Sequence, residues 1–148
     1  MTDSSVIPTE VPNDVKPIRR AMTVFTQGNA LRGRQGNVFL FPDRIAHVSS
    51  FGAQAMFGVV GLMVSRGRAQ GRARRGGRGV DTIMLREVTE VRPARYGVRG
   101  GMTEIDTQSG GHYRMGVKYS KWQQPLRDAL GALGLQVKES DQGLQVSQ

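Results

Sequence analysis

The clearest local signal in the chain is the stretch GNVFLFPDRIAHVSS, residues 36–50. Val38–Phe41 is a run of four apolar residues, and Ile45–Val48 is a second extended run. Between them, Pro42 presets φ near about −65°, and the Asp43 side chain can accept a hydrogen bond from the backbone ahead of it. Two short runs rich in β-branched and aromatic residues across a tight turn predict a β-hairpin.

Other segments of the chain repeat this strand pattern. A second hairpin is predicted where two alternating runs flank Ser109-Gly110-Gly111. In the later of these runs Tyr113, Met115 and Val117 fall on one face. The predicted strands outside the first hairpin are Met22–Gln27, Thr82–Leu85, Val88–Tyr96, Met102–Thr107 and His112–Val117.

The hydrophobic period changes near residue 120. Apolar residues at spacings of four, four and three predict one face of a helix, made by Trp122, Leu126, Leu130 and Leu133. Ser120 and Gln123 match a capping box, which places Ser120 at the N-cap. Gly134 is a typical residue at a helix C-terminus. We therefore expect an amphipathic helix that begins near Lys121.

Composition suggests where the domain begins and ends. Residues 1–20 are rich in Pro, Ser, Asp and Thr and lack periodicity, so we expect a disordered N-terminal tail. The ordered domain is expected over 21–135, with an insertion at 51–79. The polar residues 136–148 are expected to form a flexible C-terminal tail. The fold class is mainly β, an antiparallel barrel or sandwich of about seven strands capped by one C-terminal amphipathic helix.

Four segments resemble a GRAM domain, or a bacterial pleckstrin-homology-like domain. TVFTQGNALRGRQGNVFLFPDRIAHVSS is similar to the opening strands of that family. IMLREVTEVRPARYG and MTEIDTQSGGHYRMGV resemble its later strands, and KWQQPLRDALGAL resembles its helix with an early Trp. The likeness runs from Met22 to Leu135. It implies a binding module and carries over no catalytic residue.

The first half of the expected insertion is apolar. Phe51–Val64 is 14 residues long and is interrupted by Gly and Gln, whereas a membrane-spanning helix needs about 20 apolar residues. Two interpretations stay open. The segment packs on its own barrel or on a second copy of the chain, or it inserts into a membrane interface. The candidate residues for apolar insertion or for an interface are Met56, Phe57, Leu62 and Met63.

The second half is basic, and residues 51–80 contain six arginines and no acidic residue. The planar guanidinium suits phosphate groups, and a basic cluster beside an apolar patch is typical of proteins held on anionic lipid. The alternatives are RNA binding through the Arg-Gly arm 66–79 and a solvated loop with no specific partner. The candidate lipid- or phosphate-binding residues are Arg66, Arg68, Arg72, Arg74, Arg75 and Arg78.

No catalytic motif occurs in the chain. It has no cysteine, no G-x-S-x-G, no H-E-x-x-H and no P-loop. The two histidines, His47 and His112, make a weak case for a metal. The acidic residues on the predicted strands are interpreted as a solvated face: Asp81, Glu87, Glu90, Glu104 and Asp106.

These observations predict a non-catalytic binding module with no cofactor and no metal. The leading function is peripheral association with anionic membrane lipid or with a membrane-bound protein. The alternatives are nucleic-acid binding and a protein-interaction adaptor that forms homo-oligomers through 51–64. The expected location is the cytoplasm, with peripheral membrane association.

Overall fold

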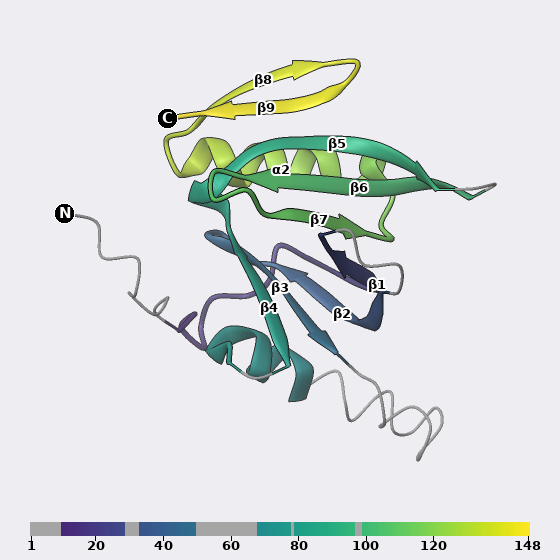
Figure 1. The fold of residues 1–148 in the computed structure, drawn as a ribbon. Helices are drawn as coiled ribbons and strands as arrows, with labels where there is room; N and C mark the ends of the chain where they lie inside the picture. The colour runs from purple at the N-terminus through teal and green to yellow at the C-terminus, as the bar shows by residue number, and fades with distance from the viewer. Residues whose placement is uncertain (1–9, 29–32, 50–67, 78, 97–98) are drawn as a thin grey trace.

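The protein is mainly β. The computed structural model describes residues 10–28, 33–49, 68–77, 79–96 and 99–148 (Figure 1). Within these ranges nine antiparallel strands form one sheet in the order β4-β3-β2-β1-β7-β6-β5-β9-β8. The strands are β1 (Arg19–Gln27), β2 (Arg34–Leu40), β3 (Arg44–Ser49), β4 (Val80–Met84), β5 (Val88–Tyr96), β6 (Arg99–Thr107), β7 (His112–Met115), β8 (Gln136–Ser140) and β9 (Gly143–Ser147).

Three helical elements complete the described chain. Residues 68–75 are helical, a short 3₁₀ turn η1 covers Leu85–Glu87, and α2 covers Tyr119–Ala132. The mainly β class is therefore confirmed, but the expected strand count of about seven is wrong, because two further strands follow α2. Among the described residues, no helix is both long and apolar enough to span a membrane.

Both predicted hairpins are confirmed. β2 and β3 pair antiparallel, with Val38 opposite His47. The Phe41 N–H donates to the Arg44 carbonyl over 2.8 Å, which closes the turn at Pro42-Asp43. β6 and β7 pair in the same way, with Ile105 opposite Tyr113.

The β2–β3 hairpin is buried on both faces. Val38, Leu40 and Ile45 belong to the main core, whereas Phe39 and Ala46 belong to a second, smaller core on the opposite face. A strand covered on both sides has no need to alternate apolar with polar residues. This double burial explains why the opening stretch is a continuous apolar run.

The main core lies between the sheet and α2. Both halves of the sheet contribute to it, for example Leu40 from β2 and Val91 from β5, so the sheet curves around one core as in a sandwich or barrel. Trp122, Leu126 and Leu130 of α2 are buried in it, as the spacing predicts. Figure 1 shows α2 lying against the β5–β7 half of the sheet.

The ends of α2 are built differently from each other. The N-cap is Lys118, with no side-chain hydrogen bond, so the capping box expected at Ser120 is wrong. At the other end Gly134 has φ +84°, and the Leu135 N–H donates to the Leu130 carbonyl over 3.3 Å. This is the Schellman arrangement in which a glycine ends a helix.

Residues 136–148 do not form the flexible tail that the sequence suggested. They fold as the β8–β9 hairpin, and β9 pairs with β5 through Val91 opposite Leu144. Leu144 is fully buried, and Val137 and Val146 pack against the main core. The interpretation as a polar tail overlooked the alternation of these three apolar residues with polar ones.

The N-terminal segment is also more ordered than expected. Residues 1–9 lie outside the described ranges, but Val11 is buried in the second core. The Ile18 N–H donates to the Leu40 carbonyl over 2.7 Å, and β1 already begins at Arg19. The ordered chain therefore includes at least half of the segment that was expected to be disordered.

Candidate functional site

The expected apolar-then-basic segment is described only in its second part. Helix 68–75 covers the outer face of the β2–β3 hairpin, and four of the six candidate arginines lie on it. The remaining candidates lie outside the described residues: Met56, Phe57, Leu62, Met63, Arg66 and Arg78.

Two alanines attach helix 68–75 to the sheet. Ala69 and Ala73 are four residues apart and share one face of the helix. Both are buried in the second core, with Phe39 and Phe41 of the hairpin. Their small side chains let the helix lie close to the strands. This part of the expected insertion is therefore packed onto the domain.

A different side of the same helix carries arginines. Arg68, Arg72 and Arg75 follow at spacings of four and three, so they share one face. Arg68 and Arg75 are exposed, and Arg72 is half-buried. The Arg72 guanidinium lies beside Gly79, where an added Cβ would come within 2.6 Å of Arg72 Nη2.

Arg74 does not belong to this exposed face. Its side chain is 7% exposed, and its guanidinium donates to the backbone carbonyls of Pro12 and Val15. It also lies 5.5 Å from the centre of the Phe41 ring, in a cation–π contact. Arg74 was expected among the lipid- or phosphate-binding residues, but the structure places it apart from the exposed arginines, with its Nη1 holding the N-terminal segment on the domain.

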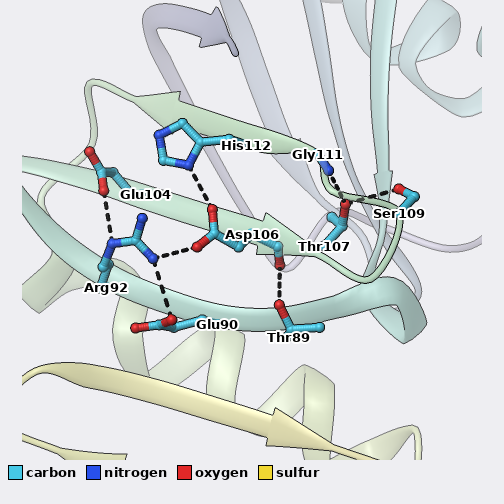
Figure 2. Close-up of polar contacts among 9 residues, drawn as sticks. All are labelled: Thr89, Glu90, Arg92, Glu104, Asp106, Thr107, Ser109, Gly111 and His112. Carbon is cyan, nitrogen blue, oxygen red and sulfur yellow. Dashed lines mark hydrogen bonds and ion pairs between the residues drawn. The ribbon is translucent and has the colours of Figure 1, made fainter. Parts of the chain in front are cut away.

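The sheet carries an ion-pair network that includes three of the acidic residues expected on a solvated face (Figure 2). Arg92 of β5 donates from Nε to Glu104 over 2.9 Å and from Nη1 to Asp106 over 2.5 Å. Glu90 lies 3.4 Å from the same guanidinium. His112 Nδ1 is 2.6 Å from the other oxygen of Asp106. Cross-strand register, which one sequence does not reveal, brings these residues together.

The network shifts the pKa of two of its members. Partial burial raises the pKa of the Asp106 carboxyl, but hydrogen bonds from Arg92 and His112 outweigh it, so the net pKa is lowered. The hydrogen bond to Asp106 raises the pKa of Arg92. No group of three His, Asp or Glu side chains in the described ranges is placed to hold a metal ion. The ion pairs and hydrogen bonds of Arg92, Glu104, Asp106 and His112 join β5, β6 and β7 as a cross-strand clamp.

A second histidine is buried in the β3–β4 part of the sheet. The His47 ring is 0% exposed and stacks on Phe25 with 4.8 Å between ring centres. Asp81 lies 3.7 Å from its Nδ1. Neither ring nitrogen has a hydrogen-bond partner within the described chain. Burial lowers the pKa of His47, and the nearby Asp81 charge only partly offsets this effect.

Comparison with known proteins assigns no family. No protein-family model matches the chain, and no curated protein matches it either. Among solved structures, it is similar to the C-terminal domain of an unknown protein from Leishmania infantum, at 11% sequence identity and a TM-score of 0.47. The match covers 80% of this chain and 83% of that one. This similarity names no ligand and no activity.

Proposed function

We propose that the chain is a non-catalytic binding module that associates with anionic membrane lipid through helix 68–75. One observation carries this proposal: Arg68 and Arg75 are exposed on the same side of the helix, with Arg72 between them. Residues 68–77 contain four arginines and no acidic residue. Ala69 and Ala73, on a different side of the helix, attach it to the folded domain.

The strand order supports a pleckstrin-homology-like architecture as part of the same proposal. β1–β4 form one antiparallel meander, β5–β7 form a second, and β1 and β7 join them. The helix α2 follows β7 and packs into the core between them. In this reading β8 and β9 are an addition to the seven-stranded unit.

The expected energetics are electrostatic. An arginine near an anionic surface contributes about 1 kcal/mol at modest salt, and this contribution falls with distance over a Debye length. Two or three arginines alone therefore give weak, salt-sensitive binding. Stable attachment needs a second contribution such as burial of apolar side chains, for which Met56, Phe57, Leu62 and Met63 are the candidates in the sequence.

Liposome flotation of the full chain tests the proposal. The variant Arg68→Gln/Arg75→Gln removes two exposed charges from the helix face. Lys121→Gln/Lys138→Gln removes two exposed charges elsewhere and serves as the matched control. We expect the first variant to lose at least about tenfold in binding to vesicles with anionic lipid, and the control to bind like the wild type.

The salt and ligand dependence separates this proposal from nucleic-acid binding. Binding to vesicles of purely zwitterionic lipid should be much weaker than binding to anionic ones. An equal loss of vesicle binding in both double variants would show that binding depends only on net charge. This outcome would contradict a site on helix 68–75. If the wild type does not bind anionic vesicles but binds RNA with a steep salt dependence, the result would support nucleic-acid binding through these arginines instead.

A further inference from the structure

A groove lies where α2 meets the residue before β1 and the turn of the β2–β3 hairpin. Its volume is about 320 Å³, at the lower end of the range for small-molecule sites. α2 supplies five of its seven lining residues, at spacings that place them along one side of the helix. The lining residues are Ile18, Pro42, Gln124, Pro125, Asp128, Ala129 and Ala132.

The walls of this groove are mostly apolar. They are made by two proline rings, two alanines and the side chain of Ile18. Ile18 is 47% exposed, the highest value among the large apolar side chains of the described residues. Covering such a side chain removes apolar surface from water, which is favourable. The groove therefore suits a ligand with a compact apolar body.

The polar edge of the groove carries a negative charge. Gln124 and Asp128 are exposed and lie one helical turn apart, and Gln124 Nε2 donates to Asp128 Oδ1 over 2.9 Å. An ionised carboxylate accepts several hydrogen bonds and donates none, so Asp128 keeps acceptor capacity beyond this bond. None of the seven lining residues is basic. A positive charge at this edge would meet an opposite charge and no like one among them.

The end of α2 adds to this negative character. Ala129 and Ala132 belong to the last turn of the helix, which contains no basic residue. The carbonyl groups at a helix C-terminus carry a partial negative charge, which favours cations nearby. Arg86 donates from Nη1 to the Leu133 carbonyl over 3.3 Å, just beyond the helix, but it does not line the groove. The helix end and Asp128 therefore favour the same sign of ligand charge.

We propose that the α2 groove binds a small amphiphilic amine in its ammonium form. The apolar body contacts Ile18, Pro42 and Pro125, and the ammonium group lies at the edge near the Asp128 carboxylate. Attraction between these charges acts over several ångströms and requires no direct hydrogen bond. A primary alkylamine resembles the lysine side chain and stays protonated at neutral pH. The groove shares no residue with helix 68–75, so the proposal is independent of lipid binding.

Titration of the full chain, labelled with ¹⁵N, with 3-phenylpropylamine tests this site by NMR. We expect saturable shifts centred on the backbone amides of Ile18, Asp128 and Ala132. The alcohol 3-phenylpropan-1-ol has nearly the same shape without the charge, and it should bind about threefold more weakly. The anion 3-phenylpropionate should bind more weakly still. The advantage of the amine over the alcohol should shrink as the salt concentration rises.

Two variants and a matched control locate the binding. Asp128→Asn keeps the shape of the side chain and removes its charge, so its affinity for the amine should fall about threefold, to that of the alcohol. Ala132→Leu fills part of the groove and should weaken amine and alcohol alike, with a Tm close to that of the wild type because Ala132 is exposed. Asp141→Asn removes an exposed carboxylate between β8 and β9 and should not change the affinity for the amine.

Several results would overturn the proposal. Shifts that do not saturate, or equal affinities of the wild type for amine and alcohol, would show that no site for an amine exists. Unchanged amine binding in Asp128→Asn or in Ala132→Leu would place the binding outside this groove. An equal loss in Asp128→Asn and Asp141→Asn would mean that the amine responds only to the net charge of the protein.

Discussion

At the scale of single residues, the buried His47 makes stability depend on pH. Its folded-state pKa lies below the ordinary value of 6.5, so the unfolded chain takes up a proton at higher pH than the folded one. The stabilisation that the neutral ring provides is complete above the unfolded pKa and is lost as pH falls through and below it. Thermal unfolding of the wild type should therefore show a declining Tm between about pH 7 and pH 5.

The variant His47→Leu isolates this effect. It keeps an apolar side chain beside Phe25 and removes the titrating group. The decline in Tm over the same pH range should be smaller than in the wild type, as followed by circular dichroism. Parallel pH profiles for the two proteins would show that another group causes the decline.

At two glycines, the backbone geometry determines whether a change to alanine should stabilise or destabilise the fold. Gly143 has φ +133°, and an added Cβ would lie 2.2 Å from the Val91 carbonyl oxygen. Gly131 lies in α2, with open space around the position of a Cβ. We expect Gly143→Ala to destabilise the fold by more than about 1 kcal/mol. The matched change Gly131→Ala should stabilise it by up to about 1 kcal/mol, because Ala favours a helix interior.

Urea unfolding of both variants measures these changes against the wild type. The midpoint should move down for Gly143→Ala and up for Gly131→Ala, with similar slopes. If Gly143→Ala has the same urea midpoint as the wild type, the close approach of β9 to β5 at Val91 is not required for the fold.

At the scale of elements, helix 68–75 depends on one buried arginine. Arg74→Ala would remove the donor to the Val15 carbonyl and the contact with Phe41, whereas the Pro12 carbonyl would still accept from the Val15 N–H. Loss of these hydrogen bonds and of the cation–π contact should lower the stability of the fold by about 1–3 kcal/mol. Arg75→Ala changes an exposed arginine next to it and should be close to neutral. Urea unfolding compares them, and equal stability of the two variants would contradict the role assigned to Arg74.

The elements differ in how far the sequence predicts them. The Val38–Phe41 run and the spacing from Trp122 to Leu130 predict a hairpin and a helix correctly, because each signal is local and strong. The β8–β9 hairpin was missed because its three apolar residues are few, and their burial depends on pairing with β5. The helical state of 68–75 was missed for a similar reason, since Ala69 and Ala73 become a packing face only when Phe39 and Phe41 point outward.

The candidate site follows the same division. The sequence identifies the arginine-rich segment, because six bases without an acid are visible in any composition count. It does not separate Arg74 from Arg75, because burial depends on the N-terminal segment lying beside the helix. The Arg92 network depends on strand register across β5–β6 and β6–β7. Residues brought together in this way are far apart in the chain, and local sequence patterns do not reveal which of them will be neighbours in the folded protein.

At the scale of the whole molecule, the C-terminal hairpin completes the sheet. β9 pairs with β5, and Leu144, opposite Val91 of β5, fills part of the main core. Without β8 and β9, β5 would become an edge strand with unpaired backbone groups, and the site of Leu144 would be an open cavity. Both changes act in the same direction, because an exposed edge promotes association and a cavity lowers stability.

Truncation after Leu135 therefore tests the architecture directly. If 136–148 were a flexible tail, its removal would leave stability and oligomeric state unchanged. We expect instead that the truncated chain unfolds at lower urea concentration and elutes from gel filtration as larger species. Leu144→Ala in the full chain is the comparison, since it creates the cavity but keeps the β5–β9 pairing. The free energy of unfolding of Leu144→Ala should fall by about 2–5 kcal/mol, and this variant should elute at the wild-type volume. An increase in size in both proteins would locate the cause in the cavity and not in the uncovered edge of β5.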